Sequence, residues 1–514
     1  MINNVNYKKV DVAIIGAGLA GSSLLSEIID NFETIALIEA GEDVHPSMKD
    51  IVTNGDYFHP SGDKYRRFGL GGSSTAWAGR CVPYDEQDFN SIHSWPIDYA
   101  ELSKYYNEAL KVLDANIKLE DIANLKNITG ELFDVSKLQF DSSYDIYSKP
   151  TNTYRKFSRK FADASHLSIY KNHVVNSIDS YDKKFKLISG LTPKNKFTIK
   201  ARYVVICNGG LEVTKLLLNL KYKKKIPISS ALGKYYMTHY AGTVGDFKAD
   251  IQNINYGYGT QNNTYVRHKY LFIKSKKQDL SFTARIHFPD IDDPKHSSSI
   301  LSFLYLFRKI VGYEYGLRLN KNIKNGKLLH ILNILKQPLK LIFNLFNLII
   351  GRYFLERKIP PLMSPVSSYF NLDIHCEQSP SPNSNITLSS DIDRYGLYKL
   401  KVKWQPDIED LNNLSINIQN LINQIGKKCI SYKVVSKEEI IRELLRHGAF
   451  GGHFIGTTRM GNNSYDSVVD SNLKMHQSDN IFVLSSSTFP SSSHANPSLT
   501  IVALAIRLAT HLKG

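Results

Sequence analysis

A glycine-rich segment near the N-terminus has the residue types and the spacing to bind a dinucleotide. Gly16, Gly18 and Gly21 stand between two apolar runs. In such a pattern the first glycine permits a tight turn, the second lets the backbone approach a pyrophosphate, and the third permits close packing of a helix on a strand. Glu39 lies about twenty residues further on, where an acidic side chain accepts hydrogen bonds from ribose hydroxyls.

The elements around this motif are those that a dinucleotide-binding turn requires. Apolar runs predict a buried parallel strand over residues 10–15, a helix over 19–29 and a second strand over 34–38. The start of such a helix presents unpaired N–H groups to phosphate charge. The alternative is a chance glycine turn beside a surface glutamate, and it leaves this strand, helix and strand unexplained. The motif alone does not distinguish FAD from NAD.

Later segments extend this unit and interrupt it. Alternating polar and apolar residues over 280–287 and 397–404 predict an antiparallel sheet in the middle of the chain. The elements that resume the first pattern are a strand over 203–206, a helix over 211–220, a strand over 481–484 and a final helix from about residue 497. The order indicates a nucleotide-binding domain with an inserted domain.

A second glycine cluster, residues 69–75, predicts by itself only a turn, although such a run can bring backbone amides close to a flavin or a phosphate. Together with the first motif and several later blocks, in the same order along the chain, it resembles the glucose-methanol-choline (GMC) oxidoreductase family. The matching segments are 71–74 with Arg80, Asp88 and Phe89; 95–99 with Tyr105 and Tyr106; 204–210; 233–239; Glu377, Gln378, Pro382 and Leu388; and 453–461, 468–470, 480–490 and 496–500.

The resemblance implies FAD as the cofactor and oxidation of an alcohol CH–OH group, for example in a sugar. A glycan or a lipid-linked alcohol is the expected substrate if the basic insertion described below docks on a membrane. The resemblance leaves the electron acceptor open. By position it implies that Gly16, Gly18, Gly21 and Glu39 hold the ADP half and that the backbone of Val175 meets the adenine. The residues implied at the flavin are Gly72, Ser73, Ser74, Ala78, Asn496, Pro497 and Thr500.

Two departures from related patterns bear on the cofactor. The run Ser74-Thr75-Ala76-Trp77 is similar to that of pyranose oxidases, in which a histidine before the tryptophan carries a covalent flavin link. Ala76 occupies that place here, so non-covalent FAD is expected. Ser485 stands where many family members carry an aspartate that contacts the cofactor, and some sugar-oxidising members lack it too.

The catalytic candidates are His453 and Asn496. Alcohol oxidation requires loss of the hydroxyl proton and transfer of a hydride from the same carbon, and a histidine near its ordinary pKa of about 6.5 can accept that proton. The resemblance places His453 in this role and lets Asn496 orient the substrate oxygen. An isolated histidine is more often structural, and His239 is interpreted so; His494 is a candidate substrate contact. No metal site is predicted.

The fold class expected is α/β, a Rossmann-like FAD-binding domain with an inserted α+β substrate domain built on an antiparallel sheet. The FAD-binding domain is predicted to be discontinuous, over 1–90, 150–234 and 445–514. The substrate-binding domain is predicted over 91–149 and 235–444, with a basic amphipathic insertion at about 302–358.

That insertion fits the family pattern less well. Apolar residues over 328–335 and 339–350 have helical spacing and are flanked by many lysines and arginines. A basic amphipathic helix can lie on an anionic membrane, but the same pattern suits helices that pack on the protein or on a second copy. The sequence does not decide between binding to a membrane and packing on protein.

Bulk composition sets broad limits. The 514 residues carry a net charge of +16. Lysines spread over a solvated surface explain this charge more simply than an anionic partner does. The sequence has no recognisable nucleic-acid-binding motif. Four cysteines far apart predict reduced thiols, and the start of the chain shows no secretory signal. A cytoplasmic enzyme is expected. If the basic insertion binds lipid, the enzyme is peripheral on the inner face of the membrane.

Two rival functions stand beside this one, an enzyme of another type and a protein of another class. Another flavoprotein, such as a monooxygenase or an amine oxidase, could share the nucleotide-binding domain but does not account for the paired His453 and Asn496. A flavin-binding, membrane-associated protein without turnover could share every motif, because motifs do not guarantee catalysis.

Overall fold

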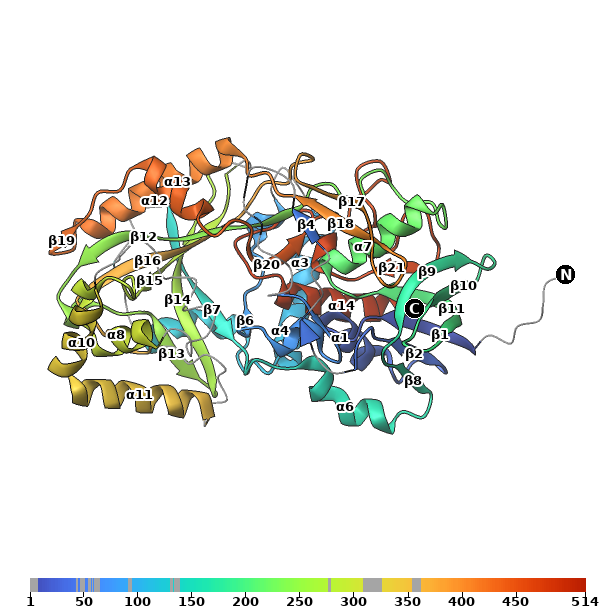
Figure 1. The fold of residues 1–514 in the computed structure, drawn as a ribbon, viewed down its shortest axis with the longest axis horizontal. Helices are drawn as coiled ribbons and strands as arrows, with labels where there is room; N and C mark the ends of the chain where they lie inside the picture. The colour runs from blue at the N-terminus through green and yellow to red at the C-terminus, as the bar shows by residue number, and fades with distance from the viewer. Residues whose placement is uncertain are drawn as a thin grey trace.

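The computed structural model describes residues 8–42, 45–46, 51–53, 57, 59, 65–90, 95–129, 133, 139–275, 279–307, 326–353 and 362–514. Two large sheets lie toward opposite ends of an elongated molecule (Figure 1). Each sheet has its own cluster of buried apolar side chains. The chain passes between the sheets several times, so segments far apart in sequence meet between them.

The first sheet has the parallel arrangement that the N-terminal motif predicts. β1 (Lys8–Ile15) pairs in parallel with β2 (Ile35–Ile38) and with β11 (Lys196–Ile206), and α1 (Leu19–Ile28) joins β1 to β2. The other strands are β8 (Leu167–Tyr170) and β21 (Ile481–Val483), both parallel to their neighbours, and β9 (Val174–Ser180) and β10 (Lys186–Leu191), which extend the sheet as antiparallel strands. The expected Rossmann-like α/β fold is confirmed.

The register of these strands sets the position of the site. β1, β2, β11 and β21 run in one direction, and Ile15 pairs with both Ile38 and Ile206. Their carboxyl ends therefore meet at one edge of the sheet, which is where open parallel sheets bind ligands. α7 (Gly210–Tyr222) follows β11, and α14 (Ser498–Lys513) lies beside α1.

The second sheet has nine strands, and its central strands are antiparallel. In order, its main path is β19 (Ser431–Tyr432), β12 (Met237–Lys248), β16 (Tyr369–Cys376), β15 (Phe282–His287), β14 (Thr264–Phe272), β7 (Phe140–Tyr147) and β6 (Arg80–Cys81), with β13 (Tyr258–Gln261) on β14 and β20 (Phe450–Ile455) on β12. The expected inserted domain with an antiparallel sheet is thus present.

One strand predicted for that sheet lies elsewhere. β18 (Tyr398–Lys403) forms a separate three-stranded sheet with β17 (Asn385–Ile392) and β4 (Ile51–Thr53). Alternation of polar and apolar residues reports that one face of a strand is buried, but it does not identify the neighbouring strand. The remaining strand pair is β3 (His45–Pro46) with β5 (Arg67–Phe68).

Helices cover the second sheet from two sides (Figure 1). α12 (Ile408–Gly426) and α13 (Lys437–Leu445) lie over β12, whereas α8 (Ser299–Leu306), α10 (Lys327–Lys336) and α11 (Pro338–Tyr353) lie together at the far end. The other helices are α2 (Glu86–Phe89), α3 (Tyr99–Leu102), α4 (Tyr106–Val112), α5 (Lys126–Thr129) and α6 (Thr153–Asp163). The predicted domain boundaries stay a prediction. β20 lies in the segment that the sequence assigned to the FAD-binding domain, and it pairs with β12 of the nine-stranded sheet.

Candidate active site

A cavity of about 670 Å³ lies at the carboxyl edge of the parallel strands. The residue that follows each strand lines it: Gly16 after β1, Glu39 after β2, Cys207 after β11 and Leu484 after β21. Its wall also includes Val175, Gly72, Ser73, Ser74, Pro497 and His453. The cavity therefore joins the N-terminal glycine motif to the C-terminal segment that carries the predicted base.

Three helices begin at this cavity without a capping side chain. The N-cap residues are Gly18 for α1, Gly209 for α7 and Pro497 for α14, none of them makes a side-chain cap hydrogen bond, and all three line the cavity. A helix start carries unpaired N–H groups and a partial positive charge. The arrangement suits an elongated ligand with anionic groups, as a dinucleotide is.

The glycines of the first motif differ in what they permit. Gly16 has φ +103°, and a Cβ there would lie 2.7 Å from the Cα of Asn208. At Gly21 a Cβ would lie 1.9 Å from the carbonyl oxygen of Gly16, so this glycine permits packing and does not line the cavity. At Gly18 the atom nearest to a Cβ is the Cα of Gly72 at 4.0 Å, and both glycines line the cavity, so their backbones face the ligand space.

Glu39 fastens the turn next to the cavity. Its Oε2 accepts from the N–H of Ala17 at 2.8 Å, and its Oε1 accepts from the N–H groups of Gly41 at 3.1 Å and Gly69 at 3.0 Å. Burial raises the pKa of the carboxyl, and these backbone N–H groups oppose the rise. Glu39 also lines the cavity, which is where a residue that accepts from a ribose hydroxyl must lie.

Four of the residues predicted at the cofactor do not line the cavity: Gly21, Ala78, Asn496 and Thr500. Thr500 is fully buried, and its Oγ1 lies 3.1 Å from the hydroxyl of Tyr106. Asn496 lies one residue before Pro497, which does line the cavity. The residues that do line the cavity, with its volume of about 670 Å³, fit a dinucleotide such as FAD.

His453 and Asn496, 43 residues apart in sequence, lie side by side. The Nδ2 of Asn496 is 3.2 Å from the Nε2 of His453. His453 comes from β20, which pairs with β12, and Asn496 comes from the loop before α14. Both side chains are half-buried. The amide of Asn496 and the Nε2 of His453 thus lie within hydrogen-bond distance of each other, next to the cavity that His453 lines.

That loop is fastened at several points. The hydroxyl of Tyr84 donates to the carbonyl of Ser492 at 2.7 Å, and the indole N–H of Trp95 donates to the Oγ of Ser491 at 2.9 Å. The Oγ of Ser493 donates to the Oδ2 of Asp88 at 2.7 Å. These contacts hold Asn496 before substrate arrives, and preorganisation of this kind lowers the cost of orienting a reactant.

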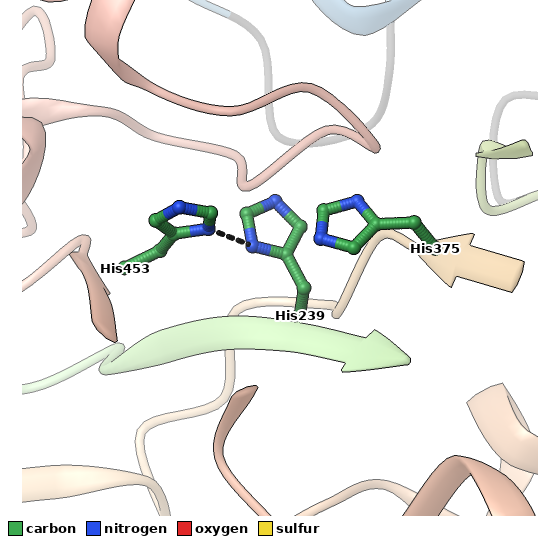
Figure 2. A group of neighbouring side chains, drawn as sticks. All are labelled: His239, His375 and His453. Atoms are coloured by element: carbon green, nitrogen blue, oxygen red, sulfur yellow. Dashed lines mark hydrogen bonds between the residues drawn. The ribbon is translucent and has the colours of Figure 1, made fainter. Parts of the chain in front are cut away.

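Two further histidines extend the line from His453. Figure 2 shows His453, His239 and His375 in a row, with the Nδ1 atoms of His453 and His239 3.0 Å apart. His239 comes from β12 and His375 from β16, and their rings stack with centroids 4.3 Å apart. Sequence reasoning treated His239 as structural and did not single out His375.

The hydrogen bonds define which nitrogen carries the proton. The Nε2 of His239 faces the carbonyl oxygen of Ser492 at 3.3 Å, and because a carbonyl only accepts, this nitrogen must donate. A neutral His239 then has an accepting Nδ1, so the Nδ1 of His453 donates to it. The Nε2 of His453 is left as an acceptor, and it faces Asn496.

The surroundings keep these imidazoles neutral. Burial lowers the pKa of His239 to about 4. The pKa of His453 lies well below its ordinary value because of burial and then the neighbouring His239 and Arg80. Burial also lowers the pKa of His375. At neutral pH the Nε2 of His453 can therefore accept a proton.

The predicted substrate contact His494 is 1% exposed and does not line the cavity. Within the described part of the chain its two ring nitrogens have no hydrogen-bond partner, and its Nε2 lies 3.5 Å from the Oδ2 of Asp85. Burial lowers its pKa well below the ordinary value. Its carbonyl oxygen accepts from the Nδ1 of His375 at 2.6 Å, so this residue contacts the histidine row through its backbone.

Among the described residues, two groups have the side chains to hold a metal ion: His239, His375 and His453, and Asp85, Asp88 and His494. In the first group, the hydrogen bonds to Ser492, to His494 and between the two Nδ1 atoms already occupy four of the six ring nitrogens. The absence of a metal site stays a prediction. The family-like segment 233–239 was the only sequence signal that pointed to His239. It did not show that His239 contacts His453.

Comparisons with known proteins place the C-terminal part of the chain. Residues 380–505 match the family model described as GMC oxidoreductase, at its C-terminal domain. A 140-residue segment is 28% identical to 6'''-hydroxyparomomycin C oxidase from Streptomyces lividus, covering 26% of this chain and 24% of that protein. Another of 134 residues is 30% identical to the fructose dehydrogenase large subunit from Gluconobacter japonicus, covering 26% and 23%. The matches span about a quarter of these relatives' length.

Solved structures extend the likeness of fold to the whole chain. Pyridoxine 4-oxidase from Mesorbium loti has a TM-score of 0.57 at 14% identity, over 98% of this chain and 99% of that one. A formate oxidase variant from Aspergillus oryzae RIB40 has a TM-score of 0.58 at 15% identity, over 98% of both chains. GMC oxidoreductases are flavoproteins that bind FAD. Residues 380–505 thus match the GMC oxidoreductase family, and the chain as a whole resembles structures of this fold.

Proposed function

We propose that this protein is an FAD-dependent oxidoreductase that oxidises an alcohol CH–OH group. The observation that carries the proposal is the pair formed by the unprotonated Nε2 of His453 and the Nδ2 of Asn496 beside the cavity. A proton acceptor and a hydrogen-bond donor that face the same region are what an alcohol oxygen needs as it becomes a carbonyl oxygen.

The cofactor, when bound, supplies the acceptor for the hydride. The residues of the chain supply the rest. An alcohol oxygen that reaches both groups accepts a hydrogen bond from Asn496 and gives its proton to the Nε2 of His453, while the same carbon loses a hydride and becomes a carbonyl carbon. Because the site disfavours imidazolium, the acquired proton leaves His453 readily before the next cycle.

The residues of the cavity support FAD held without a covalent bond. Gly16, Gly18 and Glu39 would hold the ADP half, and the start of α14 would lie against the flavin. Ala76 lines the cavity and offers no nucleophile, and burial raises the pKa of the Cys207 thiol, which keeps it protonated. Acid precipitation of the holoprotein should leave the yellow cofactor in the supernatant; yellow pellets would mean a covalent link.

The substrate class is tested by anaerobic mixing of the holoprotein with alcohols. D-fructose, paromamine, 2-methyl-1,2-propanediol and pyridoxine form the first panel, since relatives or similar structures are named for them. Bleaching of the flavin by an alcohol, with the matching aldehyde or ketone as product, supports the proposal. Bleaching by amines alone would support an amine oxidase, and a monooxygenase would need a nicotinamide as reductant. A flavin that none of these reduces would favour a protein without turnover.

We also propose a cytoplasmic location. The four cysteines are free, and Cys81, Cys207 and Cys376 are buried, which suits a reducing compartment. Fractionation of cells that produce the protein tests the proposal. Recovery of the protein anywhere other than the cytoplasm or the cytoplasmic face of the membrane would contradict it.

A further inference from the structure

The two helices at the far end of the nine-stranded sheet expose an unusual amount of apolar surface. Of the 22 large hydrophobic side chains that are exposed in the described part of the chain, 11 lie on α10 and α11. We call these 11 the apolar face: Leu328, Leu329, Ile331, Leu332, Leu335, Leu339, Ile342, Phe343, Phe346, Ile349 and Tyr353. Contiguous apolar patches of this kind mark interaction sites, whereas scattered single residues do not.

α10 is attached to the protein by its polar residues. His330 is fully buried, and its Nδ1 lies 3.0 Å from the Oγ of Ser302 on α8. Asn333 donates to the carbonyl of Pro294 at 2.9 Å and to the same Oγ at 3.3 Å. A helix on the surface of a water-soluble protein normally has the opposite arrangement, with its apolar side toward the core. Its outer side is therefore adapted to an apolar environment.

α11 carries apolar residues on two sides. Leu341, Leu345 and Leu348 pack against the core of the second sheet. On the outer side, Phe343 and Phe346 are 63% and 58% exposed, and the neighbouring members of the apolar face repeat every three or four residues along the helix. Packing on the protein thus accounts for one side of α11 and leaves the other unexplained.

The charges around the apolar face have one sign. Residues 327–353 contain Lys327, Lys336, Lys340 and Arg352 and no aspartate or glutamate, and all four basic side chains are exposed. A symmetric contact between two copies would bring these charges together. An anionic lipid surface instead attracts them, and it receives the apolar side chains at the boundary of its headgroups.

The geometry fits a helix pair that lies on a membrane. No single helix in the described residues is long and apolar enough to cross a bilayer; only α10 and α11 taken together meet that test, and they are bent by 91° at Gln337. α11 has 16 residues and is therefore about 24 Å long, less than the hydrocarbon core of about 30 Å. Two helices that meet at a right angle can both lie in one plane, and α11 forms an outer edge of the molecule in Figure 1.

We propose that the apolar face docks the protein on an anionic lipid bilayer, with both helices in the plane of the headgroups. The docking does not depend on the proposed alcohol oxidation. It adds a partner to the protein and leaves the cavity at the parallel sheet available for the cofactor.

Flotation of the FAD-loaded protein with vesicles tests the docking. One set of vesicles is phosphatidylcholine alone, and the other contains phosphatidylglycerol as well. We expect the protein to float with the anionic vesicles and much less with the neutral ones. Replacement of Lys336 and Lys340 by glutamine should weaken the anionic binding about fivefold for each lysine. Equal flotation with both vesicles, or none with either, would overturn the proposal.

Matched variants locate the surface. Phe343→Asp with Phe346→Asp should abolish flotation, whereas Ile430→Asp, at a residue 69% exposed on another part of the chain, should float normally. Both proteins should retain FAD, because neither site touches the cavity. Equal flotation of the two variants would refute the assigned face. A lipid-free dimer that the phenylalanine changes convert to a monomer would show that a second copy covers this face.

Discussion

The hydrogen bond between His453 and His239 leads to a prediction that separates a positioning role from a structural one. His239→Leu removes the acceptor for the Nδ1–H of His453 at nearly constant volume. His239→Asn keeps an acceptor, since the Oδ1 of an asparagine lies close to where a histidine has its Nδ1. If His239 sets the tautomer of His453, the two variants must differ.

The size of the effect follows from the 3.0 Å contact between the Nδ1 atoms of the two rings. A buried donor without a partner costs about 1 to 3 kcal/mol, so the proton of His453 moves to its Nε2 in most molecules of the leucine variant. The fraction with an accepting Nε2 then falls about 5- to 150-fold, at about 1.4 kcal/mol for each factor of ten. Flavin reduction should slow by the same factor, whereas the asparagine variant should stay within about threefold of the unmodified protein.

The assay is anaerobic stopped-flow reduction of the flavin by the first alcohol found to bleach it. His268→Leu is the control for loss of a buried histidine, because His268 lies on β14 and contacts the hydroxyl of Ser142 instead. In the His239→Leu protein, the loss of activity on acidification should also begin at a higher pH, since His239 helps to lower the pKa of His453. Nitrogen NMR of histidine-labelled protein reads the tautomer directly. Equal rates for the leucine and asparagine variants, or an Nε2-protonated His453 in the unmodified protein, would refute the reasoning.

Three other changes have expected outcomes. His453→Ala should keep its yellow cofactor and reduce it at least about 100-fold more slowly, the usual contribution of a general base, and an unaltered rate in stopped flow would count against the assignment. Gly18→Val fills the open space at the start of α1, so fluorescence titration should show FAD binding at least about tenfold weaker; unchanged affinity would move the pyrophosphate elsewhere. The third change is acidification. Burial lowers the pKa of His239, His268 and His296 from 6.5 to about 4, so the unfolded chain binds more protons below pH 6.5 and stability decreases there. At pH 5 each contributes a loss of about 2 kcal/mol, and denaturant midpoints that do not change between pH 7 and 5 would contradict this.

The cofactor half of the molecule could be predicted because its determinants are local. Gly16, Gly18 and Gly21 lie within six residues, and the strand and helix on either side have clear periodicity. The structure has β1, α1 and β2 within one or two residues of the predicted bounds. The close approach of Gly18 and Gly72 could not be predicted, because nothing in the sequence of the turn at 69–75 shows which other turn it faces.

The helix pair shows a different limit. The predicted helices over 328–335 and 339–350 are present as α10 and α11. The helical spacing of the apolar residues did not show which side of α10 faces the protein, and the structure directs the polar His330 and Asn333 to Ser302 in the interior. A pattern gives the sides of a helix; only the partners that α8 offers decide which side is inside.

The catalytic centre depends most on contacts between distant segments. His239 and His453 are 214 residues apart, and they meet because β12 pairs with β20. Sequence reasoning assigned His453 a role from its own block and interpreted His239 as structural, since an isolated histidine more often is. The geometry shows that His453 and His239 work together and do not have separate catalytic and structural roles. A base whose proton must lie on Nδ1 needs a neighbour that can only accept there, and His239 satisfies this because the carbonyl of Ser492 holds its other nitrogen as a donor. The role of His239 is therefore a property of three segments together, and no single one of them shows it.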